Sequence, residues 1–293
     1  MADSVIQSAP AKINLALHIT GRRDNGYHDL ESLIVFADIS DDLEANIDET
    51  DSLTISGPFG SKLKGEPNNL VLRALAAFRA RWPELSPSGL SVHLTKNLPV
   101  AAGIGGGSAD AAAALRLMAD LTPEPVPVAE LADLAAGLGA DVPACLLSRP
   151  LVARGVGEIL SPLPEFPILY VTLVNPGIGV ATADVFRRLR AHDNYGLPAL
   201  PTPLTRPAQL GLWLAETRND LEPPAVKLVP EIGVLIDELA QTPGCVLSRM
   251  SGSGATVFGL FGAEGQAHEA AAQIRRLHPD YWVGAAPLLG VAG

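Results

Sequence analysis

The sequence predicts an α+β fold in two domains. Its 293 residues, of which 47% are hydrophobic, are enough to bury the cores of two domains of ordinary size. Segments typical of strands and of helices are mixed along the chain without a regular βαβ rhythm, and no unit of about 20–50 residues repeats, which argues against a solenoid. A short β segment over residues 153–164 leads into a proline-rich connection. We therefore expect one domain over residues 1–164 and a second over residues 165–293.

The first half of the chain supplies strands and then helices. Residues 10–19, PAKINLALHI, alternate between apolar and polar side chains, as a half-buried strand does. Residues 31–39 and 89–97 predict two more strands. From Asn69 onward, apolar residues recur at helical spacing, and a further helix is expected over residues 127–137, where glycines follow.

The second half predicts the same mixture. Residues 168–177, ILYVTLVNPG, form an apolar run typical of a buried strand, and a helix is expected soon after it. The proline-rich stretch 193–224 is expected to be a loop with one short helix around LGLWLAE. Helices over residues 229–241 and 264–277 and a short β tail complete the chain, with the strand VFGLFG at 257–262 between the helices.

Charge and targeting signals exclude several classes of function. The formal net charge is −11, from 21 basic and 32 acidic residues without a long basic run, which argues against nucleic-acid binding. The N-terminus, MADSVIQSAPAK, lacks the apolar core of a signal peptide, and no apolar run is long enough for a membrane span. Cys145 and Cys245 lie in apolar contexts and are expected to be reduced thiols. We expect a cytoplasmic protein, monomeric or homodimeric, with no nucleic-acid or membrane partner.

The segment LPVAAGIGGGSADAAAAL, residues 98–115, is the most informative part of the sequence. It runs four glycines directly into an alanine-rich helix. No lysine follows as the P-loop pattern requires, and the strand and acidic residue of the dinucleotide-binding fingerprint are missing. Neither common nucleotide loop therefore explains it.

The physical signal of this segment remains when both patterns fail. The glycines would expose consecutive backbone N–H groups, and Ser108 is placed to cap the helix. A helix start carries unsatisfied donors and a partial positive charge, which suits an anion. The alternative is a tight turn with ordinary capping, but such a turn needs only one or two glycines. The segment favours phosphate binding, and a second Gly/Ser loop, MSGSGAT at residues 250–256, could add donors.

Other candidate residues have structural alternatives. Lys12 and Asn14 share the polar face of the first strand, where a lysine is usually only solvated. Asp141, in GLGADVPACLL, could be the N-cap of a short helix or a catalytic carboxylate. Tyr27 and His28 follow a glycine in a loop, where an aromatic ring can be an exposed side chain or a stacking platform. None of these is decisive alone.

In order along the chain, three of these segments resemble the three motifs of the GHMP kinases. PAKINLALHI is similar to the N-terminal strand motif, PVAAGIGGGSADAA to the central loop that opens a helix, and MSGSGATVF to the C-terminal glycine-rich loop. The resemblance implies a two-domain GHMP kinase fold, with an N-terminal domain like ribosomal protein S5 domain 2 and a ferredoxin-like C-terminal domain. It also implies an ATP-dependent kinase of a small-molecule alcohol.

Further segments resemble one branch of that family, whose substrate alcohol carries a cytidyl group. These segments are AKINLALHITGRRDNGYHDLESL, LGADVPACL, GVGEIL and RNDLEPPA. The resemblance implies that Tyr27 and His28 read the cytosine with Phe186 and Thr182 nearby, and that Asn14 contacts the other end of the substrate. It implies ATP and Mg²⁺ at the central loop, with Asn69 and Lys96 beside the adenosine. The implied loop residues are Pro99, Val100, Ala101, Ala102, Gly103, Ile104, Gly105, Gly106, Gly107, Ser108 and Ala109.

The resemblance also implies the catalytic roles. Asp141 would accept the proton of the attacking hydroxyl, and Lys12 would orient that carboxylate. The loop departs from the family pattern where Ala109 and Asp110 replace a second serine and a small polar residue, which leaves Ser108 as the loop's only hydroxyl and as the metal candidate. We expect Asp110 to point away from the ligand and to interact only with the helix start.

Two alternatives to this function stay open on the sequence alone. One is another GHMP small-molecule kinase, for example of the homoserine or mevalonate type, which would need both glycine loops but not Tyr27 and His28. The other is a nucleotide-binding protein on this fold without catalysis, against which the presence of both Lys12 and Asp141 argues.

Overall fold

The computed structural model describes residues 4–63, 65 and 68–290, and its mixture of helices and strands confirms the predicted α+β class. The chain forms two compact units. The first unit combines the N-terminal residues up to 11 with 40–100 and 105–147, and the second combines 12–39, 101–104 and the residues from 148 onward. The sequence prediction divides the chain once, between 164 and 165, whereas these units interleave. They do so because the strands β1 (Val5–Arg22) and β2 (His28–Asp48) each contribute to both.

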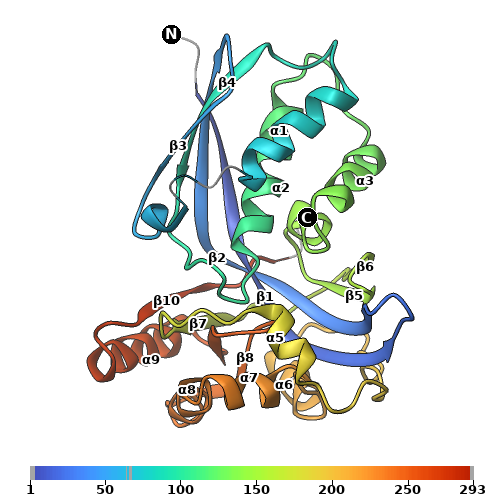
Figure 1. Cartoon of the computed structure of the whole chain (residues 1–293). Helices are drawn as coiled ribbons and strands as arrows, with labels where there is room; N and C mark the ends of the chain where they lie inside the picture. The colour runs from blue at the N-terminus through green and yellow to red at the C-terminus, as the bar shows by residue number, and fades with distance from the viewer. Residues whose placement is uncertain (1–3, 64, 66–67, 291–293) are drawn as a thin grey trace. The chain divides into compact units, whose positions relative to one another are not determined.

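The first unit packs helices beside a small sheet. The second half of β2 pairs antiparallel with β4 (Gly89–Thr95), and β3 (Ser52–Ser56) pairs parallel with β4. Four helices of this unit pack against one another (Figure 1): α1 (Leu70–Arg81), α2 (Gly106–Asp120), α3 (Val128–Leu138) and α4 (Val142–Leu147). A short 3₁₀ turn at Gly60–Leu63 contacts β3 instead.

A four-stranded antiparallel sheet organises the second unit. Its order is β10-β7-β9-β8, and its chain order β7, α8, β8, β9, α9, β10 is that of a ferredoxin-like fold, as predicted. Helices α8 and α9 lie on one face of the sheet (Figure 1). These elements are β7 (Tyr170–Asn175), α8 (Glu231–Ala240), β8 (Cys245–Met250), β9 (Val257–Phe261), α9 (Glu264–Leu277) and β10 (Trp282–Pro287).

The remaining elements of the second unit are short. They are β5 (Leu151–Gly155), β6 (Ile159–Pro162), α5 (Thr182–Arg187), α6 (Pro207–Ala215) and α7 (Glu222–Leu228). The sequence analysis expected only one helix within 193–224 and missed the start of α7. Pro223 and Pro224 suggest a loop, but they occupy the first turn of α7, where the missing N–H groups have no helical partner to lose.

Each unit has its own apolar core. In the first, the run of alanines at 111–114 of α2 is fully buried, because small side chains allow α1 to pack closely against that helix. In the second, Val257 and Phe261 of β9 are buried with Ile232 of α8 and Ile274 of α9. Within the described chain, no helix has both the length and the apolar character needed to cross a bilayer.

His18 of β1 is buried, and its ring bonds to two other segments of the second unit. Its Nδ1 lies 3.1 Å from the carbonyl oxygen of Tyr195 and 3.0 Å from that of Gly196, so Nδ1 carries the proton and donates. Its Nε2 accepts the backbone N–H of Arg218 at 3.0 Å. Burial above all, together with the positive charge of Arg218, lowers the pKa of His18 below its usual 6.5. The folded chain therefore holds a neutral imidazole.

We predict that acid destabilises the fold through His18. A second proton, on Nε2 of His18, would place an N–H donor opposite the backbone N–H of Arg218. Because the pKa of His18 is lowered in the folded chain, the unfolded chain takes up this proton more readily. The free energy of unfolding therefore falls as the pH drops below 6.5. One such group contributes at most about 1.4 kcal/mol per pH unit. Thermal melts between about pH 7.5 and about pH 5.5 should show a smaller loss for His18→Asn than for the parent chain. His268→Asn, at an exposed histidine of α9, is the control and should keep the parent's loss; equal losses in all three would contradict the role of His18.

Candidate active site

The peptide groups of the loop before α2 have a fixed orientation. Three successive carbonyl groups of the loop accept hydrogen bonds from other segments of the second unit. The bonds are Thr256 N–H to Ala102 O at 3.1 Å, Ser251 Oγ–H to Gly103 O at 3.0 Å, and Lys12 N–H to Ile104 O at 3.0 Å. Because N–H and C=O point in opposite directions in a trans peptide, the N–H groups of the following residues, 103–105, point away from these partners. These three peptide groups therefore present N–H donors on their other side.

The backbone angles of the loop have the form of an anion-binding nest. Residues with positive φ alternate with ordinary ones: φ is +54° at Ala101, +75° at Gly103 and +64° at Gly105. Such alternation turns successive N–H groups toward one concave point. Gly103 is also required by packing, since a Cβ there would lie 2.5 Å from the carbonyl oxygen of Ser251 and 2.7 Å from the nitrogen of Gly254. The second Gly/Ser loop thus packs directly on the first.

Helix α2 begins at Gly106, two residues before Ser108, the predicted N-cap. The N-cap is Gly105, in the left-handed region, and it makes no side-chain capping bond. Ser108, predicted to be the N-cap, is instead the third residue of the helix, so that prediction is wrong. The capping position has left-handed backbone, which suits glycine and disfavours serine, so the N-cap is Gly105 and the helix begins at Gly106. The first helical bond is Ala109 N–H to Gly105 O at 2.8 Å, so the N–H groups of residues 106–108 have no helical acceptor.

The last two glycines of the loop have different surroundings. A Cβ on Gly106 would lie 3.1 Å from Lys96 Nζ, which is tight packing. A Cβ on Gly107 would meet only Leu70 Cδ1, at an ordinary 3.6 Å, and Gly107 is exposed. Neither backbone strain nor crowding by the described residues explains a glycine at 107, although glycine costs a helix about 1 kcal/mol relative to alanine. A ligand that must approach the helix start does explain it.

A buried charged cluster lies beneath this helix start. The ammonium of Lys96, at the end of β4, is 2.7 Å from Asp110 Oδ2 and is also hydrogen-bonded to Asp41 Oδ2. All three side chains are at most 4% exposed. Asp41 Oδ1 accepts the backbone N–H groups of Asn97 at 2.6 Å and Leu98 at 2.8 Å. The cluster therefore ties the strand end before the loop to the helix after it.

Asp110 does not behave as the sequence analysis expected. It does not serve only the helix start; it is buried and shares Lys96 with Asp41, because Lys96 lies directly below α2. Burial raises the pKa of Asp110 to about 7, and the charge of Asp41 adds to this while Lys96 opposes it. Burial lowers the pKa of Lys96, but the two carboxylates outweigh burial and the net shift is upward. Lys96 thus stays charged, and its expected place beside the adenosine stays a prediction.

Asn69 stands at the start of α1, close to the start of α2. Its Oδ1 accepts the backbone N–H of Val71 at 2.9 Å, which makes Asn69 the N-cap of α1. The next residue, Leu70, is the side chain nearest to Gly107. The first unit therefore brings the starts of α1 and α2 close together, and the role of Asn69 beside an adenosine stays a prediction.

Lys12 and Asn14, predicted on the polar face of β1, are buried rather than solvated, at 5% and 3% exposure. Asn14 donates from Nδ2 to Ser32 Oγ at 2.8 Å, and its backbone N–H donates to Ser251 Oγ at 3.2 Å. Its Oδ1 is buried and has no hydrogen-bond partner among the described residues. An unsatisfied buried acceptor costs about 1–3 kcal/mol, so this oxygen is a strong candidate for a ligand hydroxyl.

The structure brings two of the predicted cytosine-reading rings together. The ring of His28 lies 5.1 Å from that of Phe186 on α5, and His28 Nε2 is 3.0 Å from Nδ1 of His192. Burial first, and then the charges of His192 and Arg22, lower the pKa of His28, which favours a neutral ring. Tyr27, in contrast, is 64% exposed in the turn before β2 and makes no ring contact among the described residues.

Thr182 and Asp141 both lie at helix starts. Thr182, the first residue of α5, is 2.8 Å from Ser253 of the second Gly/Ser loop through their hydroxyls. Asp141 directly precedes α4, and its carbonyl accepts the N–H of Cys145 at 3.0 Å. Its position therefore fits the N-cap interpretation, with Pro143 in the first turn, and its role as a catalytic carboxylate stays a prediction.

The metal prediction rests on Ser108. Among the described residues, no three His, Cys, Asp or Glu side chains cluster as metal ligands. The hydroxyl of Ser108 is partly exposed beside the N–H groups of the helix start. Mg²⁺ commonly takes few protein ligands and completes its shell with phosphate oxygens and water, so a single hydroxyl at this point fits a nucleotide-bound Mg²⁺.

Sequence reasoning missed several residues that build these groups. Asp41, His192, Ser251 and Ser253 each bond to a predicted residue from a distant segment. No local pattern marks Asp41 or His192. Ser251 and Ser253 lie within the second Gly/Ser loop, so that loop was the available signal, although its individual hydroxyls were not assigned.

Two protein-family models match the chain. The model of the GHMP kinase N-terminal domain matches residues 69–149, and that of the GHMP kinase C-terminal domain matches residues 202–280. The chain belongs to the GHMP kinase family. The predicted resemblance is therefore confirmed, and the two matches lie on either side of the predicted boundary at 164.

Individual GHMP kinases are similar over nearly the whole chain. A 4-diphosphocytidyl-2-C-methyl-D-erythritol kinase of Rhizobium etli is 49% identical over 282 residues, 96% of this chain and 94% of the relative. One of Parvibaculum lavamentivorans is 48% identical over 285 residues, 97% and 98% of the two chains. A crystal structure of 4-(cytidine 5'-diphospho)-2C-methyl-D-erythritol kinase matches with a TM-score of 0.80 and 34% identity, covering 98% of this chain and all of that one. A crystal structure of L. major mevalonate kinase in complex with R-mevalonate shares the fold at a TM-score of 0.72 and 16% identity, covering 100% of this chain and 98% of that one.

We predict that Gly107→Ala separates ligand binding from stability in this kinase. Alanine at 107 meets no clash and improves the helix by about 1 kcal/mol, so the melting temperature should stay or rise. Its methyl group would obstruct a phosphate at the helix start, so the KM for ATP should rise at least about tenfold, a loss of about 1.4 kcal/mol. Steady-state kinetics and a thermal melt measure both.

The matched control is Gly137→Ala. Gly137 is an exposed glycine near the end of α3 with nothing within 4 Å of its would-be Cβ. It should gain the same helical stability and keep the parent's KM. An unchanged KM in both variants would mean that the glycine at 107 has no part in binding ATP.

Proposed function

We propose that this chain transfers the γ-phosphoryl group of ATP to the C2 hydroxyl of 4-diphosphocytidyl-2-C-methyl-D-erythritol, a step of the non-mevalonate route to isoprenoid precursors. The observation that carries the proposal is the 48–49% identity, over nearly full length, to kinases named for this substrate. The N–H donors of the loop before α2 suit a nucleoside triphosphate, and the His28–Phe186 pair suits the base of a cytidyl alcohol.

The loop would hold the phosphates of ATP. Its outward N–H groups at 103–105 and those of the helix start at 106–108 form a run of donors for anionic oxygens. Phosphoryl transfer needs little covalent participation from the protein, and its rate depends on positioning and on charge stabilisation. Positioning can lower the barrier by about 7–11 kcal/mol, and each well-placed donor by about 3 kcal/mol.

Mg²⁺, when bound with the nucleotide, would neutralise charge on the phosphates, with the hydroxyl of Ser108 as its ligand from this chain. The partial positive charge of the α2 N-terminus would add less than about 1 kcal/mol. The backbone donors of this chain are therefore the main protein contribution at the phosphates.

The substrate would be recognised at both ends. His28 and Phe186 would hold the cytosine between rings, with Tyr27 and Thr182 at its edge. The buried Oδ1 of Asn14 would accept a hydroxyl of the methylerythritol group, which satisfies its missing hydrogen bond. A pyrimidine and a polyol therefore each meet a suitable chemical environment.

Asp141 would act as the general base. Its carboxylate would take the proton from the C2 hydroxyl as the hydroxyl oxygen attacks the γ-phosphorus and the bond to ADP breaks. Lys12 would orient this carboxylate and favour the alkoxide that develops. We further propose that the enzyme works in the cytoplasm as a monomer or homodimer and binds no nucleic acid, which its net charge of −11 supports.

A substrate panel tests the proposed function. ATP turnover should be fastest by far with 4-diphosphocytidyl-2-C-methyl-D-erythritol, compared with homoserine, mevalonate and galactose. CDP and CMP should compete with the preferred substrate because they carry the cytosine. A preference for any other alcohol, or no turnover at all, would sink the proposal.

We predict that Asp141→Asn lowers kcat at least about 100-fold, the usual size of a general-base contribution, and leaves ATP affinity nearly unchanged. Asparagine caps a helix about as well as aspartate, so a purely structural Asp141 should tolerate the change. Asp133→Asn, at an exposed position of α3 in the same unit, is the control and should keep the parent's kcat. Near-normal turnover of Asp141→Asn would assign Asp141 to capping alone.

A further inference from the structure

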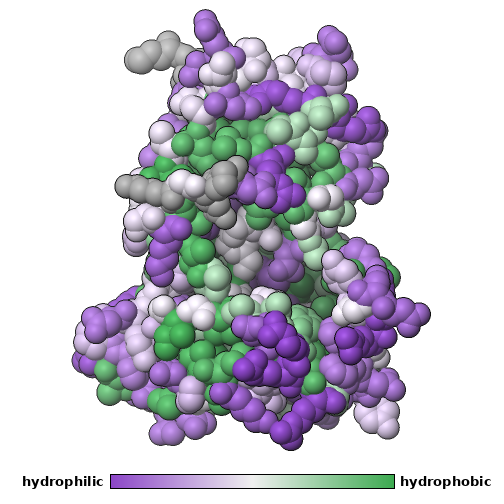
Figure 2. Space-filling view, viewed as in Figure 1, coloured by the Kyte–Doolittle hydropathy of each residue, from purple (hydrophilic) through white to green (hydrophobic). Residues whose placement is uncertain are grey.

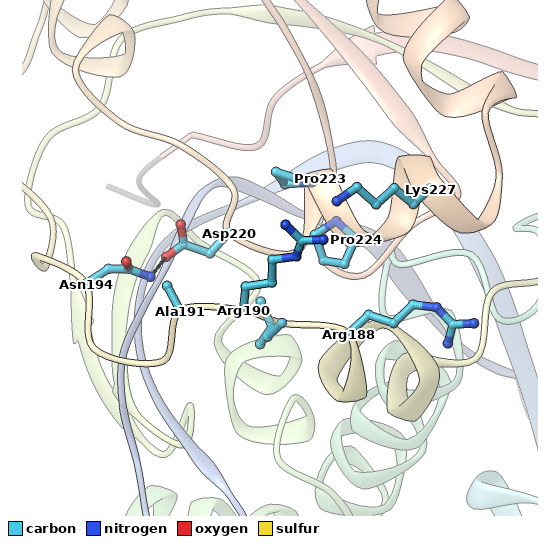
Figure 3. A pocket seen from close by; sticks show the side chains of 9 residues that line it. Arg188, Arg190, Ala191, Asn194, Asp220, Pro223, Pro224 and Lys227 are labelled. Atoms are coloured by element: carbon cyan, nitrogen blue, oxygen red, sulfur yellow. Dashed lines mark hydrogen bonds between the residues drawn. The ribbon is translucent and has the colours of Figure 1, made fainter.

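A cavity in the second unit lies outside the groups described so far. It has a volume of about 200 Å³ and lies between the segment that follows α5 and the first turn of α7 (Figure 3). Pro223 and Pro224 form part of its wall, and three basic side chains line it, those of Arg188, Arg190 and Lys227. This volume is enough for a small phosphorylated group.

The three basic side chains of the cavity are all exposed to solvent. None of the three forms an ion pair with a described carboxylate, whereas the neighbouring Arg187 pairs with Asp184 at 2.9 Å. In Figure 3, Lys227 reaches from α7 toward Pro223, and the guanidinium of Arg190 lies beside Pro224. Figure 2 shows strongly hydrophilic residues gathered over α5. Positive charge is thus concentrated here on a chain whose net charge is −11.

The one carboxylate in the lining is already committed. Asp220 accepts the backbone N–H of Ile19 at 2.7 Å, Nδ2 of Asn194 at 3.1 Å and Nε of Arg218 at 2.6 Å. These three donors hold its oxygens toward β1 and toward the neighbouring segments. Asp220 therefore shapes the cavity wall without neutralising Arg190 or Lys227.

We propose that this cavity binds a phosphate ester or diphosphate, with Arg190 and Lys227 as its main ligands. An arginine fork matches two phosphate oxygens, and a lysine supplies a compact positive charge beside them. Because both side chains are exposed, an anion could reach their charges directly from solvent.

The cavity is connected by the chain to the cytosine-reading rings. Arg190 lies four residues after Phe186 and two before His192, and both of those rings contact the ring of His28. An anion held at Arg190 would fix the segment that carries these rings. The anion has two possible sources: the diphosphate of the cytidyl substrate, in which case the inference rests on the proposed function, or a separate phosphorylated metabolite.

The test measures the binding of inorganic diphosphate by calorimetry, with the ATP loop saturated by an unreactive ATP analogue. The double variant Arg190→Gln/Lys227→Gln should bind diphosphate at least about tenfold more weakly than the parent chain. Arg187→Gln/Arg206→Gln removes the same charge from exposed positions outside the lining and should bind as the parent does. No diphosphate binding by the parent, or equal losses in the two variants, would overturn the proposal.

Further titrations with CDP and cytidine distinguish the two sources. If the anion is the substrate's diphosphate, CDP should displace inorganic diphosphate and lose affinity in the cavity variant, while cytidine should bind equally to both proteins. If it is a separate metabolite, diphosphate should bind in the presence of saturating CDP. If the parent chain bound neither cytidine nor the ATP analogue, the proposed function would be contradicted. This outcome differs from the absence of diphosphate binding, which contradicts only the cavity proposal.

Discussion

The ammonium of Lys96, held between Asp41 and Asp110, is the interaction on which the phosphate loop depends. Asp41 also binds the N–H groups of Asn97 and Leu98, so one buried carboxylate fixes the chain as it leaves β4. Lys96 carries that restraint across to α2 through Asp110. Removing one partner of such a buried pair usually costs about 3–5 kcal/mol, because the remaining charge is left unpaired. The loop is therefore anchored at both ends by a single side chain.

Between these anchors, hydrogen bonds decide which side of the loop faces a ligand. The carbonyl groups of Ala102, Gly103 and Ile104 are used inside the second unit, and this leaves the N–H groups of the next residues on the other side. Helix α2 continues the same row of donors at residues 106–108. The anion binding that we propose here would follow from backbone orientation. Positive φ favours glycine at 103 and 105, and packing does not explain the glycine at 107.

The sequence predicts what depends on local pattern and misses what depends on distant partners. Apolar periodicity predicts both ends of the helix at 264–277 correctly. The junction between the glycines and the alanines predicts the start of α2 to within a few residues. The cap at Ser108 is wrong because the choice between serine and a left-handed glycine depends on how the loop is held. The environment of Asp110 depends on Lys96 and on Asp41, which lies 69 residues earlier in the chain. No local pattern encodes that contact.

We propose that the N–H groups of residues 106–108 bind the phosphates of ATP. The most direct measurement follows the backbone amide resonances of Gly106, Gly107 and Ser108 while an unreactive ATP analogue with Mg²⁺ is added. We expect large downfield shifts of these three amide resonances, which saturate together with binding of the analogue. The amide of Gly137 in α3 should change little. Saturable binding of the analogue without shifts at these three amides would contradict it.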